Sequence, residues 1–132
     1  MTTSCALAAV QREPEPTAID ENHLGRMTLG DRRLEREVLE LFLRQTTIML
    51  ERIAAAEPPT AAAAAHTLKG SARGIGAWRV ARAAENLEQA AGGPDGYAWA
   101  GALAELKSAS LEAGAAIAAR LTVLLVELGG GR

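Results

Sequence analysis

The chain has 132 residues and a mass of 13.8 kDa, which is enough for one domain and too short for two ordinary ones. It contains 29 Ala and 17 Leu but only 5 Ile, 5 Val and 1 Phe, a balance that favours helices over strands. The formal net charge of −2 gives no electrostatic reason to bind nucleic acid, and the single cysteine, Cys5, excludes an internal disulfide framework and a cysteine metal cluster.

No segment is expected to span a membrane. The most apolar stretch, residues 113–128, is interrupted by Arg120 and Glu127 and is shorter than the ~20 residues of a span. The apolar run 5–10 has no basic residues before it, so it does not resemble a secretory signal. We therefore expect a soluble cytoplasmic protein.

Residues 1–16 contain two prolines and no periodicity, and we expect them to form a flexible arm before a helical domain at 17–128. Thr17 is predicted to cap a short helix that ends near Leu24. Asp31 is predicted to cap a long helix that ends before Pro58 and Pro59. Apolar residues cover a wide arc of this long helix, so it should contact more than one neighbour.

Three further helices follow. The first starts near Thr60 and runs through five consecutive alanines to about Arg73, and the second covers 77–91 and ends at a Gly-rich loop. The last runs from 97 to 128, with Gly101 and Gly114 as points where it could loosen, before a Gly-rich tail at 129–132. Short loops make consecutive helices antiparallel, so the chain is predicted to be all-α: an up-down-up-down four-helix bundle with a short extra N-terminal helix.

The segment 65–77 carries the residues best suited to chemistry. At about 100° per residue, His66, Lys69, Gly70 and Arg73 share one helix face, and the apolar residues lie on the opposite half. His66 should therefore point outward. A glycine inside a helix costs roughly 1 kcal/mol relative to Ala, and Gly70 would clear space for another backbone or a ligand. An exposed nucleophile, a cation one turn away and a cleared patch indicate phosphoryl chemistry on a docking surface.

The sequence His66-Thr-Leu-Lys69-Gly70-Ser71, followed by Gly76-Ala77, resembles the signature of histidine-containing phosphotransfer (HPt) domains of bacterial two-component phosphorelays. The predicted helix order is similar to that family over about residues 17–126. The resemblance implies that His66 accepts a phosphoryl group on Nε2 from the phospho-aspartate of a receiver domain and passes it to another receiver. Lys69 can reach the phosphoryl oxygens from one turn away, and Arg73 is a second candidate for stabilising their charge.

Glu88 aligns with a place where members of the family often carry a polar residue that bonds the histidine ring. It could accept Nδ1–H and fix the tautomer. A carboxylate there would also repel a phosphoryl group, and a solvated helix-face Glu is an equal alternative.

The resemblance also implies the partners: response-regulator receiver domains, with a hybrid sensor kinase as a further one. Mg²⁺ should belong to the receiver, so no cofactor or metal is expected on this chain, and no ATP-binding fingerprint indicates kinase activity of its own. Candidate docking residues are Gly70, Ser71 and an apolar strip of Leu39, Leu43 and Leu50, unless the first helix covers that strip. Nothing in the sequence marks a dimer seam, so a monomer is expected. The alternative function is a non-catalytic helical module that binds a partner through an apolar groove, and the intact set of His66, Lys69 and Gly70 argues against it.

Overall fold

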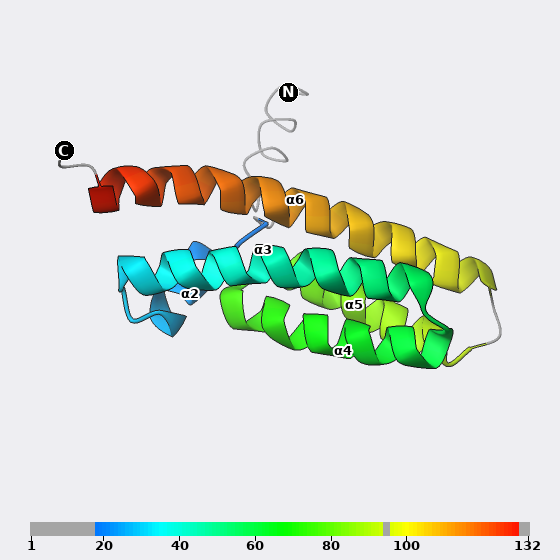
Figure 1. Ribbon diagram of the computed structural model, residues 1–132. Helices are drawn as coiled ribbons and strands as arrows, with labels where there is room; N and C mark the ends of the chain where they lie inside the picture. Colours follow the sequence, from blue (N-terminus) through cyan, green and yellow to red (C-terminus); the bar gives the residue numbers. More distant parts are fainter. Residues whose placement is uncertain (1–17, 94–95, 130–132) are drawn as a thin grey trace, which may run out of the picture.

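The computed structural model describes residues 18–93 and 96–129, whose regular secondary structure is entirely helical. The helices are α2 (Glu21–Met27), α3 (Arg32–Ala55), α4 (Pro58–Ile75), α5 (Trp78–Ala91) and α6 (Gly96–Gly129). The four long helices lie side by side in a bundle, and the colours of α3 and α6 run in opposite directions along it (Figure 1). The predicted all-α bundle with a short additional helix is confirmed. The expected arm at 1–16 and residues 130–132 of the tail lie outside the described residues.

The helix starts agree with the sequence at one position and differ at two. Asp31 caps α3 as predicted, because its carboxylate accepts hydrogen bonds from the backbone N–H of Arg33 and Leu34. The cap of α2 is Asp20, which accepts the N–H of His23 at 3.1 Å, and not the predicted Thr17, which lies outside the described residues. The predicted end near Leu24 is wrong, because α2 continues through Gly25 to Met27.

The two prolines at 58 and 59 begin α4 rather than end α3, and the predicted cap at Thr60 is wrong. Proline has no N–H to donate, and the first turn of a helix leaves its N–H groups unbonded anyway. α3 itself ends at Ala55. α6 is continuous through Gly101 and Gly114, so neither glycine loosens it.

The core of the bundle is built largely from small side chains. The predicted core face of α4 is confirmed, because Ala61, Ala65, Leu68 and Ala72 are all fully buried. Alanine side chains let α4 approach α5 closely. This close approach brings α5 side chains within reach of the outward face of α4, where His66 lies.

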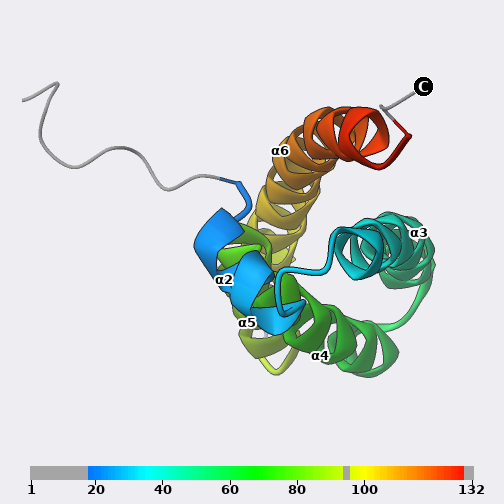
Figure 2. The ribbon, with the colours of Figure 1, turned by 90° about the vertical axis from the view of Figure 1, so that its left-hand side faces the viewer.

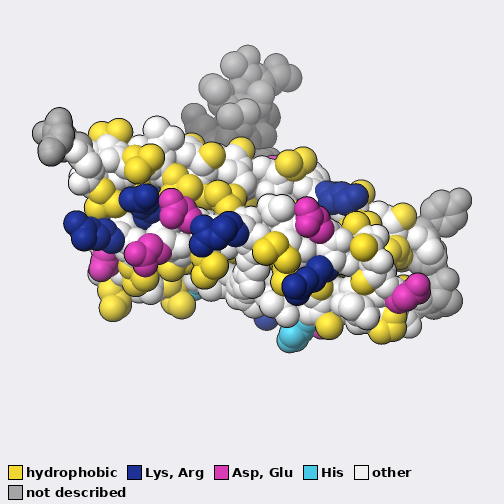
Figure 3. Space-filling view, viewed as in Figure 1, with side chains coloured by type: hydrophobic (Ala, Val, Ile, Leu, Met, Phe, Trp, Pro, Cys, Tyr) yellow, Lys and Arg dark blue, Asp and Glu magenta, His cyan; other side chains and the backbone are white. Residues whose placement is uncertain are grey.

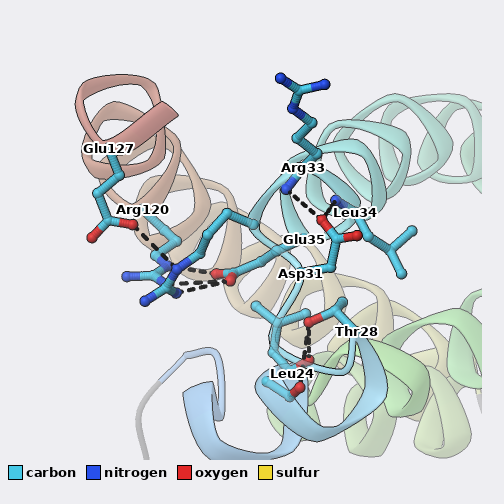
Figure 4. A network of polar contacts seen from close by, with 10 residues as sticks. Leu24, Thr28, Asp31, Arg33, Leu34, Glu35, Arg120 and Glu127 are labelled. Carbon is cyan, nitrogen blue, oxygen red and sulfur yellow. Dashed lines mark hydrogen bonds and ion pairs between the residues drawn. The ribbon is translucent and has the colours of Figure 1, made fainter. Parts of the chain in front are cut away.

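A buried ion pair ties α3 to α6 (Figure 4). Glu35 was expected on a solvated face of charges at 31–37, but its side chain is only 4 % exposed and it bonds the guanidinium of Arg120. That hydrogen bond raises the pKa of Arg120. Arg32 bonds both Glu35 and Glu127, so the network joins the start of α3 to the end of α6. The expectation fails because i,i+4 spacing within one helix says nothing about a partner 85 residues away.

The short helix α2 lies across one end of the bundle (Figure 2). Its cap residue Asp20 donates its backbone N–H to the carbonyl oxygen of Gly76 at 2.9 Å and accepts the indole N–H of Trp78. The indole bond is the main reason that the pKa of Asp20 is lowered. Gly76 has φ +83°, and a Cβ there would lie 2.9 Å from Asp20, so only glycine fits this turn. The turn between α4 and α5 is thereby held against α2.

Helix α6 is long and apolar enough over Ala98–Gly129 to cross a membrane, judged by length and composition alone. This differs from the expectation that no segment would qualify. Core helices of soluble proteins satisfy the same criterion, and α6 packs against α3 and α5 in the bundle, so it is weak evidence for a membrane span.

Candidate functional site

His66 lies near the middle of α4 on its outward face, as the helical periodicity predicts. Its side chain is 66 % exposed. The neighbouring turns of α4 direct Ala65 and Leu68 inward, where both are fully buried. The imidazole is therefore held at a fixed point on the surface by a helix whose opposite face forms the core.

Glu88 of α5 contacts the histidine ring. Nδ1 of His66 lies 2.8 Å from Oε2 of Glu88. The hydrogen bond from Lys69 is the main reason that the pKa of Glu88 is lowered, and the bond from His66 lowers the pKa further. An ionised carboxylate can only accept a hydrogen bond, so the proton of this bond sits on Nδ1. In the neutral ring, Nε2 then carries the free lone pair, which is the requirement for a nucleophile at that atom.

Lys69 completes a three-residue cluster. Its Nζ donates to Oε1 of Glu88 at 2.9 Å, and only 13 % of its side chain is exposed. One carboxylate thus joins the ammonium of Lys69 to the imidazole of His66. With the imidazole neutral, the cluster has no net charge, which answers the concern that Glu88 alone would repel a phosphoryl group.

The backbone beside His66 is open. A Cβ built on Gly70 meets nothing within 4 Å, and the same is true of Gly74 one turn further along. Packing within this protein therefore does not require glycine at either position. Ser71, the next candidate, is only half-buried on the side of α4 toward α3.

Arg73 is not part of the cluster. Its guanidinium lies 3.8 Å from Glu85 of α5, about two turns along α4 from His66. Its carbonyl oxygen accepts a hydrogen bond from Nε2 of His23 at 2.9 Å. His23, expected to be a plain surface residue, is instead half-buried and packs its ring against Trp78.

The predicted docking strip on α3 requires a correction. Leu39 is fully buried, so it cannot contact a partner at the surface. Leu43 and Leu50 are half-buried and line a groove between α3 and α6, away from His66. The correction concerns Leu39 alone, whereas the docking role of Leu43 and Leu50 stays a prediction.

Two exposed apolar residues lie on the solvent side of α3. Leu41 is 57 % and Ile48 is 45 % exposed. At about 100° per residue both point away from the buried Leu39 and Thr46. Both belong to the first apolar stripe of the α3 sequence, so periodicity could have found them.

Among the described residues, no group of three or more His, Cys, Asp or Glu side chains is arranged to hold a metal ion. The chemistry available at His66 is that of an exposed imidazole, one carboxylate and one ammonium.

Comparisons with known proteins agree with this geometry. The family model for the Hpt domain matches residues 37–119, which are 83 of the 132 residues. The chain therefore belongs to the Hpt domain family, whose members serve as histidine phosphotransfer modules in phosphorelays.

Among solved structures, the fold is similar to that of a putative histidine-containing phosphotransfer protein from rice. The TM-score is 0.71 with 18 % sequence identity, over 93 % of this chain and 89 % of the rice chain. At this identity the likeness concerns the fold. No curated protein matches the chain significantly.

Proposed function

We propose that this protein is a phosphocarrier in a two-component phosphorelay. His66 receives a phosphoryl group on Nε2 from the phospho-aspartate of a receiver domain and delivers it to another receiver domain. The observation that carries the proposal is the exposed ring whose Nδ1 is held by Glu88 at 2.8 Å, which leaves the Nε2 lone pair facing solvent.

The transfer step balances without a proton acceptor. The Nε2 lone pair forms a bond to phosphorus, the bond between phosphorus and the aspartyl oxygen breaks, and its electron pair stays on the aspartate carboxylate. The ring keeps its Nδ1 proton and becomes a phosphoryl-imidazolium with a positive charge. Glu88 already lies against that side of the ring, so its negative charge is in place before the positive charge develops. In the reverse step the bond between phosphorus and Nε2 breaks, and its electron pair returns to Nε2.

Lys69 has a different role before and after transfer. Before transfer it balances the charge of Glu88 through the 2.9 Å ion pair. After transfer the imidazolium takes over as the partner of Glu88, and the ammonium becomes available to the phosphoryl oxygens one helical turn away. Arg73 contributes only long-range attraction, because its guanidinium pairs with Glu85.

The receiver docks on the α3–α4 side of His66. Gly70 and Gly74 leave the backbone of α4 open there, and Leu41 and Ile48 are exposed apolar side chains on the solvent side of α3. Open backbone beside a reactive group, with a few exposed apolar side chains on the next helix, suits a transient interface at the low end of the usual size range. We expect the receiver to bring the Mg²⁺ that in-line phosphoryl transfer needs.

Phosphotransfer from ³²P-labelled receiver domains tests the proposal. We expect label on the wild-type chain and none on His66→Gln. The matched control is His23→Gln, which removes the second of the two histidines and should still be labelled. Circular dichroism checks that both variants keep their helical content. Continued labelling of His66→Gln, with a folded protein, would show that another residue accepts the phosphoryl group.

A further inference from the structure

The outward face of α6 has no partner within the bundle. Leu111 is 76 %, Leu125 54 % and Val126 65 % exposed. Only 22 % of the most apolar 18-residue window of this helix is buried. Figure 3 shows hydrophobic side chains along α6 at the upper edge of the molecule. Monomeric proteins rarely leave a contiguous apolar surface of this kind in water, so a partner is expected to cover it.

The exposed stripe is free of charge for about four turns. The charged residues of this part of α6 point elsewhere: Glu112 pairs with Arg79 of α5 at 2.7 Å, and Arg120 pairs with Glu35 of α3. What remains outward is an uncharged row, namely Leu111, Ala115, Ala118, Thr122 and Leu125. The hydroxyl of Thr122 bonds the carbonyl oxygen of Ala118 at 3.1 Å, so the row presents no unpaired hydroxyl.

The two leucines of the row are placed symmetrically about Ala118. Leu111 lies seven residues before it and Leu125 seven residues after it, which are the spacings of two helical turns. If a second copy of α6 runs in the opposite direction with Ala118 at the crossing point, Leu111 of each copy meets Leu125 of the other. Alanine at the centre lets the two helices approach closely.

A groove lies where the partner's leucine would enter. It has a volume of about 520 Å³, and its lining combines apolar and polar side chains: Leu43, Thr46, Thr47 and Leu50 of α3 and Lys107, Ser110, Leu111, Gly114 and Ala115 of α6. It opens beside Leu111, so it can receive Leu125 of the second copy. The face thus carries both a protruding side chain and its receptor, as an interface between identical surfaces requires.

We propose that α6 forms a two-fold symmetric interface between two copies of this chain, with the helices antiparallel and Ala118 at the axis. The row offers no cluster of basic residues, which a helix lying on an anionic lipid surface would carry. The four turns span about 21 Å, so the interface is at the small end of the range and the dimer dissociates on dilution. His66 lies on α4 and stays open in both copies, so this interface is additional to the proposed phosphotransfer.

Sedimentation velocity and light scattering over a range of about 1 µM to 1 mM test the proposal on the full chain. We expect the mass to rise from 13.8 kDa toward twice that value as concentration increases. Leu111→Lys and Leu125→Glu should each weaken the dimer at least about tenfold, because each places a charge against a leucine. The double variant Leu111→Lys/Leu125→Glu should recover it, because each new cation then faces a new anion across the axis. Leu41→Glu, on the solvent side of α3, is the matched control and should dimerise like the wild type.

Three results would overturn the interface. They are a mass of 13.8 kDa at every concentration, a dimer that survives both single variants, and single variants that the double variant does not rescue. Cosedimentation with vesicles of phosphatidylcholine and phosphatidylglycerol that is lost in Leu111→Lys would assign the face to a membrane instead. Phosphotransfer assays on the folded Leu111→Lys and Leu125→Glu variants keep this test separate from the proposed function, since both should still be labelled on His66.

Discussion

Removal of the carboxylate at position 88 gives a quantitative test of how the ring of His66 is prepared. In Glu88→Ala, the ring loses the hydrogen-bond acceptor that lies 2.8 Å from Nδ1. A hydrogen bond to a charged group is worth about 1.5–3 kcal/mol, and the lower end applies because the His66 side chain is 66 % exposed. A loss of about 1.5 kcal/mol in transition-state stabilisation corresponds to a roughly tenfold slower transfer.

Glu88→Gln separates the hydrogen bond from the charge. Its amide oxygen can still accept from Nδ1–H, so the tautomer is kept, but the negative charge that faces the phosphoryl-imidazolium is gone. We expect a loss of about threefold, in line with the smaller value of a neutral hydrogen bond. Glu85→Ala is the matched control on the same helix, because Glu85 contacts Arg73 and not His66, and its transfer rate should stay within about twofold of the wild type.

Single-turnover transfer from a labelled receiver measures these rates, and ¹⁵N NMR of the imidazole reports the tautomer. The wild type and Glu88→Gln should carry the proton on Nδ1, and Glu88→Ala should show a mixture of tautomers. A Glu88→Ala protein that transfers at the wild-type rate with Nδ1 still protonated would refute the role of Glu88.

Three further predictions concern the docking surface, the bundle and pH. Gly70→Gln should stabilise the protein by roughly 0.5–1 kcal/mol in urea unfolding, because its Cβ enters open space. The same variant should weaken receiver binding on the order of tenfold, and unchanged binding in titration calorimetry would remove Gly70 from the interface. Glu35→Leu should lower the free energy of unfolding by about 3 kcal/mol and the melting temperature by roughly 10 °C, since it leaves Arg120 without its carboxylate. The double variant Glu35→Leu/Arg120→Met should recover most of the loss, and equal melting temperatures for the wild type and the single variant would contradict this reasoning. The pKa of Glu88 is lower in the folded chain than its ordinary value of 4.5, so its contribution to stability is present above that value and is lost as the pH falls through the folded pKa. In urea unfolding between pH 6 and pH 3, the free energy of unfolding should fall less for Glu88→Gln than for the wild type, and equal falls would show that the pair with Lys69 adds no stability.

Much of the fold follows from local sequence. The Ala-rich composition, the cap at Asp31 and the buried face of α4 are consequences of helix propensity and 3.6-residue periodicity, and these act within a few residues of one another. The errors at Thr17 and Thr60 also have a local cause. Several residues near each helix start can serve as caps, and two prolines are as acceptable in a first turn as after a last one.

Residues that meet across the bundle were harder to foresee. Glu35 and Arg120 are 85 positions apart, so their pairing depends on how α6 packs on α3. Leu39 is fully buried and lines one cavity with Glu21 and Asn22 of α2 and Ile117 of α6, and the sequence of α3 alone shows neither neighbour. The sequence shows no pattern that would bring His23, Asp20 and Trp78 together. Their contact depends on the turn at Gly76, which bonds the backbone of Asp20.

The candidate site itself was largely visible in one short segment. His66, Lys69 and Gly70 share a face because of their spacing within a single helix. The contact of Glu88 with the ring came from similarity to the Hpt family. What neither source indicated is that Lys69 pairs with that same carboxylate, since this requires the register between α4 and α5.

The most direct measurement is the position of the phosphoryl group within the labelled protein. ¹H–¹⁵N and ³¹P NMR of the chain after reaction with a phosphorylated receiver distinguish the two ring nitrogens of the modified histidine. The structure predicts one phosphoryl group on Nε2 of His66, with Nδ1 still protonated toward Glu88. A phosphoryl group on Nδ1, or on any side chain other than His66, would contradict the account.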